Sequence, residues 1–296
     1  MRGSCRLCNN TAELRESHIV PSFVFKWLKE TSGTGFIRFG HTPNQRTQDG
    51  LKLYWLCDDC EGLLSSWETE FANNIFHPMN KGEKSSSSYG PWLLKFAVSV
   101  SWRVLNSFVE SQDLPHFSGG LLEKTNMALS RWKEFLLDQS PHPAQFEQHM
   151  LPLDRLDRFT YPDMPSNINR YILRTVDIDA VKVGNANGFV YSKIGRIVLV
   201  GFIDMPYPRQ WKGTKLHVKS GLLGSKHYSL PAEFGEYFMN KARRLAELNK
   251  SMSPKQKQKI EDTYRKDLDR AISSETLKAM GHDVALFGKN AFAKDE

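Results

Sequence analysis

Two stretches of the chain decide its fold: residues 5–21 read CRLCNNTAELRESHIVP, and residues 53–71 read LYWLCDDCEGLLSSWETEF. They hold all four cysteines of the chain, as one C-x-x-C pair in each stretch. These cysteines are Cys5, Cys8, Cys57 and Cys60. Each pair can form a knuckle that presents two thiolates, and two knuckles complete the tetrahedral site of one zinc ion. Four thiolates close such a site, so the spacing predicts a structural zinc rather than a catalytic one.

A redox role and disulfide bonding are the other interpretations of these cysteines. Redox-active C-x-x-C pairs lie at the strand-to-helix turn of a thioredoxin-like βαβ unit, and neither stretch belongs to a predicted βαβ unit. The start MRGSCRLC lacks the apolar run of a secretory signal, and the apolar segments 92–105 and 194–203 are too short or too interrupted to span a bilayer. We therefore expect a cytoplasmic protein with no membrane partner, whose reduced thiols favour metal over disulfides.

The remaining chain changes in character three times. A Gly- and Ser-rich run at 81–90 predicts a loop, and from Pro91 and again over 121–137 apolar residues recur at helical spacing. Three segments rich in Val, Ile, Tyr and Thr follow, and they predict strands within residues 171–183, 188–203 and 214–223. After Pro231 the helical pattern returns, with one long basic helix expected from the N-cap Ser253 onward.

These changes predict an α+β protein of four consecutive segments. A zinc-binding module is followed by a helical region, a small antiparallel sheet and a basic helical C-terminal region. The predicted segments are residues 1–80, 91–165, 166–232 and 233–296.

The charge of the chain favours a polyanionic partner. A formal net charge of +7 and a pI of about 9.1 suit nucleic acid, because neutralising phosphates with Lys and Arg releases counterions. The predicted nucleic-acid-binding residues are Lys255, Lys257 and Lys259, with further positive charge at Arg103, Arg131, Lys133, Arg243 and Arg244. The alternative is that these side chains form the solvated faces of helices.

The order of motifs around the cysteines carries a family resemblance. A C-x-x-C pair, a short strand ending in His-Ile-x-Pro and then Leu-Cys-x-x-Cys opening a helix resemble the zinc-stabilised HNH, or ββα-metal, endonucleases. The resemblance covers about the first quarter of the chain. It implies a treble-clef module, hydrolysis of nucleic-acid phosphodiesters, and a bacterial or phage context in which some nucleases of the wider family defend against phage.

The same resemblance implies roles for particular residues. His18 matches the general base that activates the attacking water, and the helix from Cys60 to Phe76 matches the metal-facing helix. Glu61 stands where the family commonly has a metal-binding histidine, so it is the first candidate ligand for a catalytic Mg²⁺ or Mn²⁺, and Glu68 is the second. Ser17 replaces the Asp or His that commonly precedes the base.

Each of these roles has a structural alternative. His18 can instead donate to a backbone carbonyl and pack against the zinc knuckle. Glu61 can be a favourable carboxylate in the first turn of a helix. The two functions to be weighed are therefore a metal-dependent endonuclease and a non-catalytic, zinc-stabilised module that binds nucleic acid or a protein partner.

Overall fold

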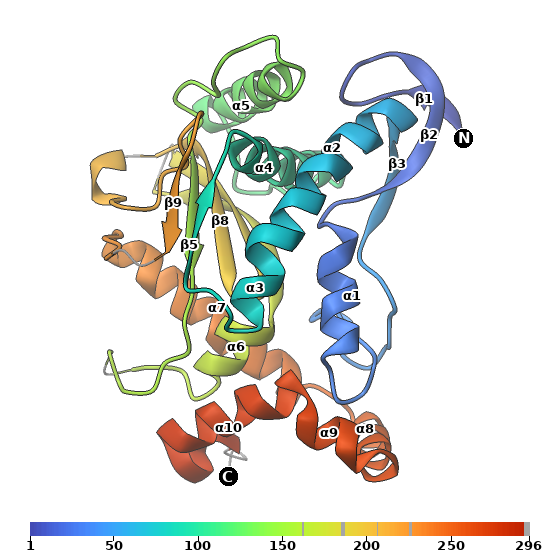
Figure 1. The fold of residues 1–296 in the computed structure, drawn as a ribbon, viewed down its shortest axis with the longest axis vertical. Coiled ribbons are helices and arrows are strands. Elements are labelled where there is room, and N and C mark those ends of the chain that lie inside the picture. Colours follow the sequence, from blue (N-terminus) through green and yellow to red (C-terminus); the bar gives the residue numbers. More distant parts are fainter. Residues whose placement is uncertain (162, 185–186, 206, 225–226, 293–296) are drawn as a thin grey trace. The chain divides into compact units, whose positions relative to one another are not determined.

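A computed structural model describes residues 1–161, 163–184, 187–205, 207–224 and 227–292 (Figure 1). Some residues of the predicted segments, among them 293–296 at the end of the last one, lie outside this description. Helices combine with small antiparallel sheets, which confirms the α+β class. In the part of the chain just defined, no helix combines the length and the apolar character that a membrane span requires.

The chain forms two compact units, and each is assembled from three stretches that alternate along the sequence. Unit 1 consists of Met1–Pro21, Leu51–Pro152 and Val176–Ser229. Unit 2 consists of Ser22–Gly50, Leu153–Thr175 and Leu230–Glu296. Both units are discontinuous in sequence, so they do not correspond to the four consecutive segments predicted above. The boundaries of those segments stay a prediction.

The N-terminal part of unit 1 is a three-stranded antiparallel sheet followed by a helix. The strands lie in the order β1-β2-β3, and Leu14 pairs with Cys57 across β2 and β3. Their bounds are β1 Arg2–Ser4, β2 Thr11–His18 and β3 Lys52–Cys57, with helix α2 at Asp58–Phe71, a π-helical turn η1 at Ala72–Phe76 and α3 at His77–Asn80. The expected strand that ends at His18 and the expected helix after the second knuckle are both present.

A second, four-stranded antiparallel sheet in unit 1 has the order β5-β8-β7-β6. Its strands are β5 Gln148–Pro152, β6 Val176–Val183, β7 Asn187–Ile194 and β8 Ile197–Asp204, and the helices beside it are α4 Trp92–Glu110 and α5 Gly120–Leu136. Helix α4 contacts all four strands as well as α2 and α5, which explains why its apolar residues go almost all the way round. Both helices appear where the apolar spacing predicted them.

The prediction of a loop over residues 81–90 is wrong for its second half. Strand β4 (Ser86–Tyr89) pairs there with β9 (Gly221–Gly224). Elsewhere in unit 1, a short 3₁₀ turn, η2, covers Pro208–Gln210. Serine-rich sequence carries little strand signal of its own, so this pairing depends on a partner far along the chain.

Aromatic side chains join α2 and β3 to α4 inside unit 1. Phe71 stacks on Phe96 with ring centroids 3.9 Å apart, and Trp55 meets Trp102 edge-on at 6.4 Å. Such pairs add about 0.5–1.5 kcal/mol beyond the burial of their surface. The N-terminal sheet and its helix therefore share a core with α4.

Unit 2 is mainly helical. Its elements are α1 Ser22–Glu30, α6 Ile168–Arg174, α7 Ala232–Lys250, α8 Pro254–Lys266, α9 Leu268–Ser273, α10 Glu275–Phe287 and the 3₁₀ turn η3 at Gly288–Phe292. Its core joins α6 to α7 through Ile168, Tyr171, Ile172 and Ala242. Helix α7 lies where the pattern after Pro231 predicted a helix.

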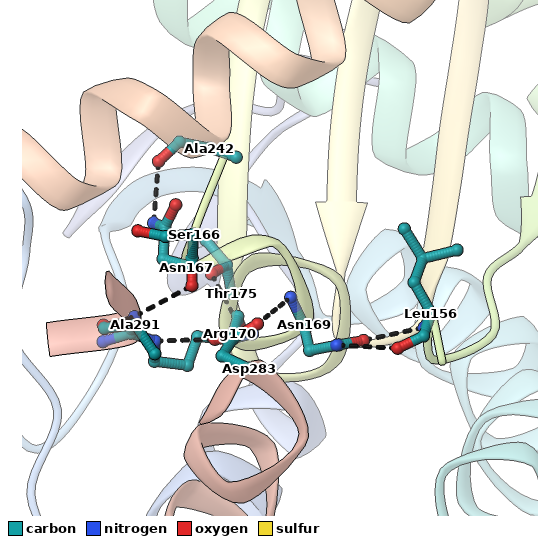
Figure 2. A network of polar contacts seen from close by, with 9 residues as sticks. All are labelled: Leu156, Ser166, Asn167, Asn169, Arg170, Thr175, Ala242, Asp283 and Ala291. Carbon is teal, nitrogen blue, oxygen red and sulfur yellow. Dashed lines mark hydrogen bonds and ion pairs between the residues drawn. The ribbon is translucent and has the colours of Figure 1, made fainter. Parts of the chain in front are cut away.

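Helix α6 corrects the expectation that residues 171–174 belong to a strand. Figure 2 shows the backbone N–H groups of Asn169 and Arg170 directed at the carboxylate of Asp283 on α10, at 2.7 and 3.2 Å, and the Arg170 side chain also donates to it at 2.7 Å. A fully buried carboxylate thus satisfies the first donors of a short helix. The partner lies more than a hundred residues away in sequence, so local propensity could not indicate this helix.

The single long helix expected from Ser253 onward is divided into three. Asp267 accepts a hydrogen bond from the backbone N–H of Arg270 at 3.0 Å, and Ser274 accepts one from that of Leu277 at 3.2 Å. Both side chains act as N-caps, which begin the new helices α9 and α10. Asp267 and Ser274 were the sequence signals of these two helix starts, but the helical spacing of apolar residues continues across both positions.

Candidate metal centre and adjoining strand end

The structure brings the four predicted cysteines together as free thiols. Cys5 and Cys8 lie in the connection between β1 and β2, Cys57 ends β3, and Cys60 lies in the first turn of α2. Their sulfur atoms all lie within 4.8 Å of one another, and those of Cys8 and Cys57 are 3.8 Å apart. Zinc–sulfur bonds of about 2.3 Å in a tetrahedron separate sulfurs by about 3.8 Å, so the group fits a metal ion such as zinc.

The thiols differ in how readily they lose a proton. Burial raises the pKa of Cys57 and of Cys60. Burial also opposes ionisation of Cys5, but hydrogen bonds from the backbone N–H groups of Cys8, Cys57 and Leu7 outweigh it and lower the pKa of Cys5 to about 7. A metal needs all its ligands as thiolates, so binding at this centre must release protons and must weaken at low pH.

Helices α4 and α5 hold the first knuckle in place. The guanidinium of Arg6, between Cys5 and Cys8, lies 4.7 Å from the ring centroid of Trp55. It also donates to Asn106 at 3.2 Å and pairs with Glu110, both on α4. Lys133 of α5 donates to the Arg6 carbonyl at 3.2 Å. The position of the knuckle therefore depends on residues well beyond the predicted zinc-binding segment 1–80.

The end of β2 connects with α2 through Ser17. The Ser17 hydroxyl is fully buried and donates to a carboxylate oxygen of Glu61 at 2.7 Å. His18 is partly exposed, as expected when neighbouring strand residues point to opposite faces. The structure thus places the Glu61 carboxylate against Ser17, one residue before His18.

Arg103 of α4 ties this strand end to α2 a second time. Its side chain is only 2% exposed, donates to the His18 carbonyl at 2.9 Å and pairs with Glu68 at 2.6 Å. The buried position corrects the expectation that Arg103 contributes to a basic surface. Glu68, the second candidate ligand for a catalytic metal, is engaged in the ion pair with Arg103. A lone arginine within an apolar helical run was the sequence signal of this role.

The cysteine centre and the end of β2 differ in the number of possible metal ligands that they bring together. Among the described residues, the cysteines are the one group of three or more His, Cys, Asp or Glu side chains placed to hold a metal ion. Neither His18 nor Glu61 belongs to such a group. The catalytic Mg²⁺ or Mn²⁺ thus stays a prediction, and these two residues would supply it with few protein ligands.

The three predicted nucleic-acid-binding lysines are exposed on α8. Gln256 is the buried residue between them, and Lys255 and Lys259 are one helical turn apart beside it. Lys257 points to the other side and donates to the Lys250 carbonyl at 3.5 Å. Their role in binding stays a prediction.

Comparison with known proteins finds no match among protein families, curated proteins or solved structures. The function must therefore be argued from the residues themselves.

Proposed function

We propose that the chain is an HNH-like, metal-dependent endonuclease whose N-terminal module is a zinc-stabilised treble clef. One observation supports the proposal above the others, the hydrogen bond from Ser17 to Glu61. It joins the two positions at which the resemblance expects metal ligands, and it does so beside the expected base. Zinc in a four-thiolate site has no open coordination position, so the chemistry is assigned to this neighbouring strand end.

In the proposed reaction, His18 removes a proton from the water that attacks the phosphodiester phosphorus. An imidazole suits this role because its ordinary pKa lies near neutrality. Glu61 would hold Mg²⁺ or Mn²⁺, an ion whose chemistry is to polarise a phosphoryl oxygen and offset the charge of the leaving oxygen. Arg103 fixes the backbone on which His18 is carried.

A second function competes with this one, a non-catalytic zinc-stabilised module that binds nucleic acid or protein. The observation in its favour is that His18 and Glu61 form no three-ligand group within the described chain. The two functions predict opposite results for cleavage and the same result for the zinc content.

Cleavage by wild type and His18→Ala decides between them. We expect wild type to cut plasmid DNA or single-stranded RNA with Mg²⁺ or Mn²⁺, and the substitution to slow cutting by about 10²–10⁴-fold, as loss of a general base does. Glu61→Gln should raise the metal concentration needed for half-maximal cutting. His116→Ala is the matched control, because His116 is an exposed histidine of the same unit that has no expected role in cleavage.

The endonuclease proposal fails if wild type cuts neither substrate with either ion, or if His18→Ala cuts as fast as wild type. Retained zinc and an unchanged melting temperature must accompany loss of activity, since a misfolded variant would also be inactive.

The zinc itself is tested by metal analysis. We expect one zinc per chain, lost in Cys60→Ser together with the folded structure of the N-terminal sheet, because metal binding at such sites can contribute on the order of 10 kcal/mol to folding. Ser65→Ala, on the exposed side of the same helix, is the control. A folded wild-type protein purified without any bound metal would contradict the assignment.

A further inference from the structure

Two arginines of unit 2 lie opposite each other in the loop between α1 and β3. Ile37 and Thr47 form an antiparallel bridge, with reciprocal backbone hydrogen bonds of 3.2 and 3.0 Å. The next residues toward the tip of this hairpin are Arg38 and Arg46. Residues opposite each other across antiparallel strands point to the same face, with Cβ atoms about 4.5–5.5 Å apart. The bridge therefore favours both side chains on one face of the hairpin, and the charge of Arg46 does act on Arg38.

Neighbouring side chains fix both arginines. Arg38 donates to the side-chain oxygen of Gln256 on α8 at 2.8 Å, when the Gln256 amide is oriented so that its nitrogen donates to the Asn44 carbonyl at 3.2 Å. The Arg46 guanidinium lies over the ring of Phe36, 4.7 Å from its centroid. Preorganised guanidinium groups lose little entropy when they bind a ligand.

No acidic side chain of the described chain pairs with either arginine. Burial, followed by the charge of Arg46, lowers the pKa of Arg38, and Tyr264 is the neighbour that opposes this shift. The Nε of Arg38 is buried without a hydrogen-bond acceptor. Like charges directly opposite each other are unfavourable, so the arrangement has a cost that a bound anion would remove.

We infer that Arg38 and Arg46 form a binding site for a phosphate group. Two guanidinium forks match the oxygens of a phosphate, and charge-assisted hydrogen bonds of this kind are about twice as strong as neutral ones. Arg46 is exposed, so a ligand can reach the pair from solvent. Gln256 belongs to the first turn of α8, and the positive end of that helix adds to the attraction.

The site is independent of the proposed cleavage, because it requires neither His18 nor a catalytic metal. Its phosphate can come from a nucleic-acid backbone or from free inorganic phosphate, and both present the same oxygens. The two sources are separated by the probes below.

The first experiment titrates the full chain with inorganic phosphate at constant ionic strength and follows its melting temperature. We expect phosphate to stabilise wild type, and Arg46→Gln to weaken the apparent affinity at least about tenfold through loss of one guanidinium fork. Without phosphate, Arg46→Gln should melt close to wild type, because it removes both an unfavourable like-charge contact with Arg38 and a favourable contact with the Phe36 ring. Arg46→Lys, which keeps the charge but loses the fork, should fall between them.

Arg265→Gln is the matched control, since Arg265 is an exposed arginine of α8 that lies 3.9 Å from Glu261. It removes the same charge and should respond to phosphate as wild type does. A second titration uses a single-stranded oligonucleotide. Weaker binding by Arg46→Gln, with the salt slope reduced by about 1, identifies the nucleic-acid backbone as the source of the phosphate.

A response to inorganic phosphate without an effect on oligonucleotide binding identifies free phosphate instead. The inference is overturned if Arg46→Gln and Arg265→Gln respond equally to both probes, or if wild type responds to neither.

Discussion

Among single residues, His149 in unit 1 couples stability to pH. It is 1% exposed, stacks on Phe202 with centroids 4.2 Å apart and shares a hydrogen bond of 2.8 Å with Thr214. Its other ring nitrogen lies 3.6 Å from Glu147, which is an ion-pair contact rather than a hydrogen bond. Glu147 is in turn paired with Lys215. The imidazole is therefore enclosed on all sides.

Burial lowers the pKa of His149 in the folded protein, so the unfolded chain binds more protons than the folded one below the ordinary value of about 6.5. We expect the free energy of unfolding to fall as pH falls below about 6.5, by up to about 1.4 kcal/mol per pH unit. The contact with His149 is the largest cause that lowers the pKa of Glu147, and Lys215 lowers it further, while burial opposes both. The unfolded chain therefore protonates this carboxylate before the folded protein does, so the loss of stability continues at more acidic pH.

Urea unfolding at several pH values tests this slope. His149→Gln should flatten it between pH 6.5 and 5, whatever the variant costs in absolute stability, while the exposed His116→Gln should leave it as in wild type. Equal slopes in all three proteins would mean that His149 is not the group responsible.

At the same scale, the sequence predicted part of the candidate site. Each C-x-x-C pair forms a knuckle locally, and one tetrahedral metal site needs two such pairs. This was enough to predict that the four thiols come together. The position of Glu61 directly after the second knuckle followed from the same register. Arg103 was assigned to a surface because the partner of a long side chain is chosen by tertiary packing, which no local pattern contains.

Between elements, the ion pair of Arg103 and Glu68 joins α4 to α2 and, through the His18 carbonyl, to the end of β2. Removing one partner of a buried pair leaves the other charge uncompensated. We expect Arg103→Met to destabilise the protein by about 3–5 kcal/mol and Glu68→Gln by less, since glutamine still accepts a hydrogen bond. The double variant should cost clearly less than the sum of the two.

A double-mutant cycle by urea unfolding measures this coupling. The control cycle uses Arg15 and Asp58, an exposed pair at 2.9 Å between β2 and α2, for which the coupling should be about 0–1 kcal/mol. If the two cycles give the same small coupling, Arg103 does not hold these elements together.

The elements themselves were predictable to different degrees. Helix α4 was evident from Pro91 and its apolar spacing, because a long buried helix carries a strong periodic signal. Helix α6 was mistaken for strand because its sequence is β-prone and its stability depends on Asp283. The divisions at Asp267 and Ser274 were missed because a capping side chain can also be accommodated within a helix.

For the molecule as a whole, the predicted zinc-binding segment 1–80 can be tested as a fragment. It contains the four cysteines but lacks α4, which supplies Trp102 to Trp55 and Phe96 to Phe71. We expect the fragment to bind zinc without cooperative thermal unfolding, because these aromatic rings and the Arg6 partners are missing.

Circular dichroism melting of the zinc-loaded fragment, beside the full chain at the same zinc concentration, is the measurement. A sharp zinc-dependent transition in the fragment would instead establish residues 1–80 as an autonomous module.

The alternation of the two units along the sequence has a consequence for synthesis on the ribosome. Every stretch of unit 1 has been made once Ser229 is added, whereas α6 of unit 2 still lacks the carboxylate of Asp283. These positions are 54 residues apart (283 − 229), which at about 5–20 residues per second corresponds to roughly 3–11 s. During that interval the nascent chain can complete unit 1, while residues 22–50 and 153–175, which are already made, still lack the parts of unit 2 that are synthesised last.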